Sequence, residues 1–278
     1  MTPDPYEEFR SAVERPEDAL DLGHAALAIA RPEYPQLDIG AYLGRIEALA
    51  AEVDKHLTGT ESHLHRSIAA LSYILFQKNG YRGNRDEYFD AKNSFLNDVI
   101  ERRTGIPISL SVLYMEVARR VGLPLQGVGF PGHFLVKYFD GLQEIIIDPF
   151  NGGEIKTADS LRQLLNGVYG GRVPWTEHLL DPIGKRQIIR RMLNNLKFIY
   201  LKQRDFVKAL MALERMMIAE PNVPEDLRDR GAVYDALEYF PQAKADFENY
   251  LRLAPDAPDA GEVREQLAGL ATRSTSLH

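Results

Sequence analysis

One stretch of the chain, 108–121, carries apolar residues on nearly every side of the helix that it would form. Such a helix is stable only where neighbouring elements cover all of its faces, so it has to lie at the centre of a folded unit. Three strand-like stretches follow it, at 125–130, 133–139 and 142–148. A buried helix followed by a small antiparallel sheet predicts an α+β core.

The region before this core reads as a series of helices. Apolar residues recur at helical spacing from about 7 to 78, with prolines as breaks, and 93–103 reads as a further helix. After the core, 151–182 reads as a loop with short helices around Trp175. The sequence thus predicts a helical N-terminal region ahead of the α+β core.

The C-terminal part shows an internal repeat with a period of 34 residues. The matched pairs are Tyr200 and Tyr234, Phe206 and Phe240, Ala209 and Ala243, and Pro221 and Pro255. This period is typical of tetratricopeptide repeats, which stack as helix pairs and present a concave surface for peptides. With a final helix at about 260–270, the pattern predicts an all-α array. We place the domains at 1–183 and 184–278.

The charge balance excludes one class of partner. A net charge of -7 and the lack of a lysine or arginine run leave no basic surface for a phosphate backbone, so we expect no nucleic-acid partner. No apolar run approaches the roughly 20 residues that span a bilayer, and the N-terminus lacks the order of a secretory signal. We expect a cytoplasmic protein without a membrane partner.

The chain contains no cysteine. That rules out disulfides, thiolate metal sites and every mechanism that uses a thiol nucleophile. The sequence offers no other cluster of metal ligands either. We therefore expect neither a metal nor a cofactor.

The strongest chemical signal comes from the Asp140-Gly141 dipeptide between the last two strand-like stretches. This dipeptide favours a two-residue type I′ turn, and that turn would place His133 directly opposite Asp148. The same register brings opposite charges together across the hairpin. Directly opposed side chains have Cβ atoms about 4.5–5.5 Å apart, close enough for a carboxylate to hold an imidazole. The hairpin thus predicts a general base with its orienting group.

Several short motifs occur in a distinctive order. They are Gly105-Ile-Pro-Ile-Ser-Leu-Ser111 at the start of the central helix, Val121-Gly-Leu-Pro124, Gly132-His133 and Ile147-Asp148-Pro-Phe150. In this order the chain resembles the transglutaminase-like superfamily. More narrowly, the run from Arg103 to Tyr114 and Phe130-Pro-Gly-His-Phe134 look like the bacterial SirB-type branch, which joins such a domain to C-terminal tetratricopeptide repeats. The resemblance extends from about residue 30 to 256.

The resemblance implies a papain-like α+β fold with a Cys-His-Asp triad, in which the cysteine opens the central helix and the other two residues lie on adjacent strands. His133 and Asp148 match the last two members. The cysteine position falls on Pro107 in an alignment without a gap from Gly122, and on Ser109 after a shift of two residues. Pro107 would leave the site without a nucleophile.

Two functional hypotheses follow from the missing thiol. The first is a non-catalytic regulatory or scaffolding protein that binds a protein or peptide through the repeats or through a groove near His133. The second is a serine-dependent amidase, peptidase or acyltransferase with Ser109 as nucleophile, His133 as general base and Asp148 as its orienting group. A serine near a helix start is also strongly favoured as a cap, which would give Ser109 a purely structural role.

Overall fold

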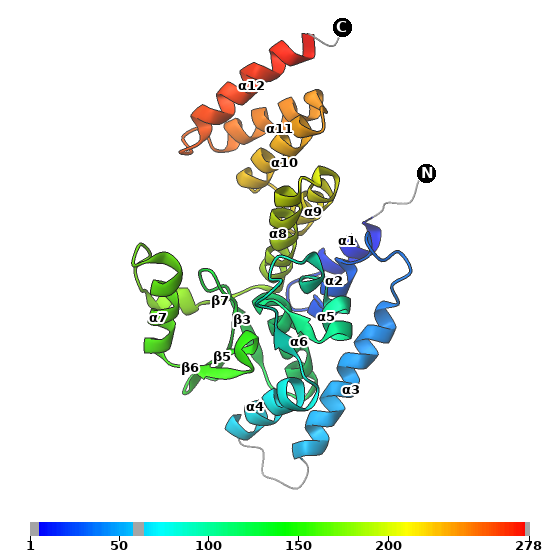
Figure 1. Cartoon of the computed structure of the whole chain (residues 1–278), viewed down its shortest axis with the longest axis vertical. Coiled ribbons are helices and arrows are strands. Elements are labelled where there is room, and N and C mark those ends of the chain that lie inside the picture. Colours follow the sequence, from blue (N-terminus) through cyan, green and yellow to red (C-terminus); the bar gives the residue numbers. More distant parts are fainter. Residues whose placement is uncertain (1–5, 58–63, 276–278) are drawn as a thin grey trace. The chain divides into compact units, whose positions relative to one another are not determined.

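The computed structural model describes residues 6–57 and 64–275. The chain divides into two compact units, Met1–Met192 and Leu193–His278, and the division falls within helix α8 (Lys185–Gln203). Figure 1 shows the elements of both units along the chain. Within the described ranges, no helix combines the length and the apolar character needed to cross a bilayer.

Helices dominate the first part of unit 1, as the sequence predicts. They are α1 (Glu7–Val13), α2 (Leu22–Ala28), α3 (Ile39–Leu57), α4 (Leu64–Ser72), which runs on into a π-helical turn (Tyr73–Lys78), and α5 (Leu96–Arg102). The predicted helix over 93–103 is shorter than expected, because a 3₁₀ turn (Ala91–Asn93) ends before α5 begins. Local side chains set some of these limits: Asp21 caps α2 by accepting a hydrogen bond from the His24 amide at 2.8 Å.

Helix α6 (Pro107–Arg120) is the predicted central helix, and every residue from Pro107 to Ala118 is buried. Proline suits the first helical position because its missing N–H would have no partner there. Helices α2 to α5 and strands β3 and β4 all pack against α6. The one buried acid on it, Glu116, is held by Arg120 at 2.7 Å.

The sheet has five antiparallel strands in the order β6-β5-β4-β3-β7. Their bounds are β3 (Leu125–Val128), β4 (Leu135–Phe139), β5 (Glu144–Asp148), β6 (Glu154–Lys156) and β7 (Pro182–Ile183). The three inner strands match the predicted stretches, but the two outer strands were not predicted, because they are too short to show an alternating pattern. A separate pair, β1 (Arg82–Gly83) and β2 (Thr104–Gly105), is parallel.

Helices cover both faces of this sheet, with α6 on one side and α7 (Ala158–Tyr169) on the other (Figure 1). Leu161 and Leu165 of α7 join Leu135 and Ile146 in one buried cluster. Unit 1 is thus an α+β layered core, which confirms the predicted fold class for this part of the chain.

The predicted hairpin register is wrong by two residues. Phe139 pairs with Glu144, not with Leu142, so the loop holds four residues instead of two. A type I′ turn needs a positive φ at both central positions, and only Gly141 has one, at 92°. Asp140 instead uses its carboxylate to accept the amides of Leu142 (2.9 Å) and Gln143 (2.8 Å), which stabilises the longer loop.

Unit 2 is all-α, as the 34-residue period predicts. After the end of α8 it contains α9 (Phe206–Ala219), α10 (Pro224–Ala236), α11 (Phe240–Leu253) and α12 (Ala260–Thr275). The repeated phenylalanines, Phe206 and Phe240, each open the second helix of a pair. Arg230 of α10 holds the buried carboxylate of Asp246 on α11 by two hydrogen bonds, at 2.7 and 2.8 Å.

Close packing in unit 2 makes a specific prediction at two helical glycines. A Cβ added at Gly231 would lie 2.7 Å from the buried ring of Phe247, whereas one at Gly269 meets nothing within 4 Å. We expect Gly231→Ala to lower the free energy of unfolding by about 1–3 kcal/mol through overpacking. Gly269→Ala should raise it by up to about 1 kcal/mol, because alanine favours a helix. Urea unfolding followed by circular dichroism checks both, and a gain for both variants would contradict the packing of α10 on α11.

Candidate functional site

His133 lies at the mouth of the hairpin, just before β4. The chain turns sharply ahead of it, where the amide of His133 donates to the carbonyl of Phe130 at 3.0 Å. Gly132 allows this turn because its φ is 69° and because a Cβ there would lie only 2.8 Å from Val168. The turn thereby aims the imidazole along the sheet toward the end of β5.

Asp148 is the last residue of β5 and meets this imidazole. His133 Nε2 lies 3.0 Å from Asp148 Oδ1, and the two side chains are 8% and 0% exposed. In the observed register the two positions are diagonal rather than directly opposed. Their side chains still share one face, because a shift of two residues preserves the alternation of a strand.

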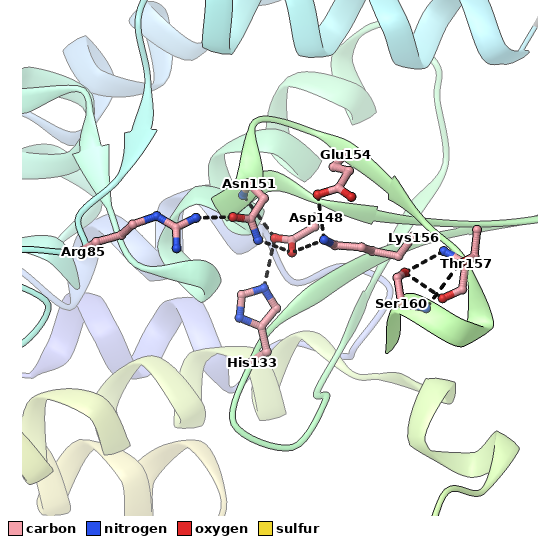
Figure 2. Close-up of polar contacts among 8 residues, drawn as sticks. All are labelled: Arg85, His133, Asp148, Asn151, Glu154, Lys156, Thr157 and Ser160. Carbon is pink, nitrogen blue, oxygen red and sulfur yellow. Dashed lines mark hydrogen bonds and ion pairs between the residues drawn. The ribbon is translucent and has the colours of Figure 1, made fainter. Parts of the chain in front are cut away.

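Further polar groups surround the Asp148 carboxylate (Figure 2). Asn151 donates to it twice, from Nδ2 at 2.7 Å and from its amide at 3.3 Å, and Lys156 Nζ lies 3.6 Å away. Arg85 in turn donates to the Asn151 side-chain oxygen. Burial alone would raise the pKa of Asp148, but the hydrogen bond and charge of His133, the Asn151 amide and the Lys156 ammonium together lower it below its usual value.

The His133 ring is fixed on one edge and free on the other. The ring of Phe150 packs edge-on against it, with centroids 5.9 Å apart. Among the described residues, the second ring nitrogen, Nδ1, has no hydrogen-bond partner. The imidazole is thus oriented by Asp148, and its free nitrogen is available to another group.

Ser109 does not contact this pair. Its side chain is fully buried, and its hydroxyl donates to the carbonyl of Asn93 at 2.6 Å, with the carbonyl of Ile106 as a second acceptor at 3.2 Å. The same oxygen accepts the Ile106 amide at 3.1 Å. In the described part of the chain, no hydrogen bond joins Ser109 to His133. Pro107, the other position that could match the family's cysteine, is the first residue of α6 and has no nucleophilic atom.

The sequence reasoning missed three participants in this site. Asn151 follows Asp148 by three residues, a spacing typical of a capping aspartate, so this one was detectable. Lys156 comes from the unpredicted strand β6, and Arg85 from a distant loop, so neither carried a local signal. Over the described residues there is no group of three or more histidines and acids that could hold a metal ion.

Comparison with known proteins supports the two-part organisation. A family model described as the transglutaminase-like superfamily matches residues 40–194, which is more than half of the chain. A model described as tetratricopeptide repeat matches residues 196–268. No solved structure matches the chain.

Several proteins are similar over nearly the whole length. A UPF0162 protein of Xylella fastidiosa (strain 9a5c) is 41% identical over 271 residues, covering 94% of both chains. A UPF0162 protein of Vibrio cholerae is 30% identical over 263 residues, covering 94% of this chain and 97% of its own. F-box only protein 21 of Mus musculus is 36% identical over 135 residues, 46% of this chain and 21% of that protein. The chain therefore belongs to the transglutaminase-like superfamily and to the UPF0162 proteins, and it joins the transglutaminase-like domain to tetratricopeptide repeats.

Proposed function

We propose that this protein is a non-catalytic regulatory or scaffolding protein that acts through protein contacts. The observation that carries the proposal is the hydrogen bonding of Ser109, whose hydroxyl donates to main-chain carbonyls and not to His133. The chain has no cysteine to replace it. A transglutaminase-like domain without a cysteine, and without a serine that reaches His133, keeps its fold and lacks the group that attacks a substrate.

The chemistry of a serine nucleophile explains why this matters. A catalytic serine passes its proton to the imidazole as it attacks, so its hydroxyl has to reach that imidazole and the substrate together. Ser109 is 0% exposed and caps the first turn of α6 through Ile106. Using it as a nucleophile would require breaking that cap and opening the helix start. A structural role for Ser109 needs no such change.

His133 and Asp148 then act as a structural pair. They connect the residue before β4 with the last residue of β5, and Asp148 also caps the 3₁₀ turn Pro149–Asn151 that follows. Buried acids are stable when every oxygen has a partner, and both oxygens of Asp148 have one. The pair therefore fixes the open end of the hairpin.

The tetratricopeptide unit supplies a surface for a partner. A groove of about 580 Å³ lies at α11 and α12, with apolar walls that include Phe240, Pro241 and Leu267. Two exposed cations, Lys244 and Arg264, also line it. This combination is complementary to a protein segment that carries apolar side chains beside acidic ones.

The non-catalytic role predicts that the purified protein does not react with a fluorophosphonate probe for nucleophilic serines. Parent, Ser109→Ala and His133→Ala should all stay unlabelled in a gel assay that includes a known serine hydrolase as positive control. Labelling of the parent that disappears in both variants would establish the serine-dependent hydrolase or acyltransferase instead.

The scaffolding role predicts a partner whose retention depends on the groove. The unaltered chain should retain a partner protein from an extract of the cells that produce it. We expect the double variant Lys244→Glu/Arg264→Glu to retain at least about tenfold less of that partner, because the variant reverses both positive charges of the groove. Arg252→Glu, an exposed position on α11 outside the groove, is the matched control. Quantitative mass spectrometry after cross-linking measures the retention. Equal recovery with all three chains would exclude the groove, and no specific recovery at all would count against scaffolding.

A structural His133–Asp148 pair predicts a loss of stability with a defined pH dependence. Asp148→Asn should lower the free energy of unfolding at pH 7 by roughly 1.5–3 kcal/mol, the usual range for hydrogen bonds to a charged group. The folded chain holds the pKa of Asp148 below its usual value, so this stabilisation is complete above the unfolded value of about 3.9. The difference between parent and variant should shrink as the pH falls below that value.

Urea unfolding at pH 7, 5 and 3 measures this difference. Asp159→Asn is the matched control, because Asp159 is 84% exposed and pairs with the exposed Arg162. We expect it to change stability by less than about 1 kcal/mol. A difference for Asp148→Asn that grows between pH 5 and pH 3 would have the wrong sign for a carboxylate stabilised in its charged form.

A further inference from the structure

Arg191 lies directly behind the His133 turn. It belongs to the part of α8 within unit 1, and its guanidinium lies over the ring of Phe134 at 5.6 Å from the centroid. Nη2 donates to the main-chain carbonyl of His133 at 3.2 Å. The chain passes so close to Nη1 that a Cβ on Gly129 would come within 2.5 Å of it. The guanidinium is thus held in place by packing and by one hydrogen bond.

Its charge has no acidic counterpart among the residues that the structure describes. No carboxylate of the described residues comes within ion-pair distance of Arg191, and burial lowers the pKa of its guanidinium. Two other part-buried arginines differ in this respect: Arg120 pairs with Glu116 at 2.7 Å, and Arg230 pairs with Asp246 at 2.7 Å. A partly buried cation without an anion is costly for the folded chain, and a bound anion would offset part of that cost.

Two tyrosines reach the same turn. In the described part of the chain neither the hydroxyl of Tyr169 nor that of Tyr88 has a hydrogen-bond partner, and both phenols act on the pKa of Arg191 against the effect of burial. The ring of Tyr169 approaches Gly132, the residue before His133. Tyr88 packs on Phe150 with centroids 6.2 Å apart, and Phe150 packs on His133.

We propose that Arg191, with the hydroxyls of Tyr88 and Tyr169, binds an oxyanion, a carboxylate or a phosphate, carried by a ligand with an aromatic or apolar body. The guanidinium has free donors in the planar arrangement that matches either oxyanion, and phenol hydroxyls donate to the same oxygens. Exposed Tyr88 and Phe89 offer the apolar surface for the body of the ligand. This site goes beyond the proposed function, since it needs neither catalysis nor a partner of the tetratricopeptide unit.

The test compares three small probes by ligand-observed NMR titration of the full chain. N-acetylphenylalanine carries the carboxylate, N-acetylphenylalaninamide is its neutral match, and phenyl phosphate carries the alternative oxyanion. We expect saturable binding of at least one anionic probe in the millimolar range or tighter, and binding of the amide weaker by about tenfold or more. Which anion binds more tightly distinguishes a carboxylate ligand from a phosphate ligand.

Variants assign the binding to Arg191. Arg191→Gln should lower the affinity for the anionic probe by about tenfold or more. Arg191→Lys should lower it less, because lysine keeps the positive charge but lacks the paired planar donors of the guanidinium. Arg66→Gln, which removes an exposed arginine of α4, is the control and should bind as the parent does. Tyr169→Phe should reduce the affinity by a smaller factor.

One further measurement needs no variant, in case Arg191→Gln does not fold. Replacing chloride by sulfate at constant ionic strength should displace the anionic probe from the parent chain. Equal affinity for N-acetylphenylalanine and its amide, unchanged binding in folded Arg191→Gln, or no binding of any probe in the millimolar range would each overturn the proposal. Loss of partner binding in the Lys244→Glu/Arg264→Glu chain would leave it untouched, so the two proposals fail separately.

Discussion

The complete burial of α6 is the constraint on which the rest of unit 1 depends. Every residue from Pro107 to Ala118 is covered, so elements have to pack on all of its sides. Helices α2 to α5 and strands β3 and β4 provide that cover. Because β4 is fixed against α6 and α7 packs on the opposite face of the sheet, the turn before β4 is fixed as well. The position of His133 thus follows from the packing of a helix that contributes no group to it.

The sequence was sufficient to predict the fold class and the contact between His133 and Asp148 in the candidate site. Hydrophobic periodicity located α6 and the inner strands, and the 34-residue period located the helix pairs of unit 2. The pairing of His133 with Asp148 was right although the register was wrong. Asp140-Gly141 suggested the tighter turn, but the Asp140 carboxylate stabilises a longer loop. A shift by an even number of residues leaves the same side chains on the same face, so the error did not separate the pair.

The rest of the site depends on contacts that no local pattern encodes. Whether Ser109 points to His133 or into its own helix cap is decided by the carbonyl of Asn93, 16 residues earlier in the chain. Strands β6 and β7 are too short for a periodic signal, and Lys156 reaches Asp148 only because β6 pairs with β5. Arg191 lies in a helix whose sequence identifies it as part of the repeats, yet its side chain belongs to the His133 turn.

The separation between His133 and Asp148 along the chain has a consequence for folding. They are 15 residues apart, within one hairpin, so bringing them together closes a short loop at a small cost in chain entropy. A nucleophile on α6 has to be brought to that hairpin from a different element, and its side chain adds nothing to the hairpin's own stability. His133 and Asp148 can therefore stay together as part of a folding unit whether or not α6 carries a nucleophile. A reaction at this site would depend on a contact between α6 and the hairpin, whereas the His133–Asp148 contact lies within the hairpin. The reaction can therefore be lost in this architecture without loss of the fold.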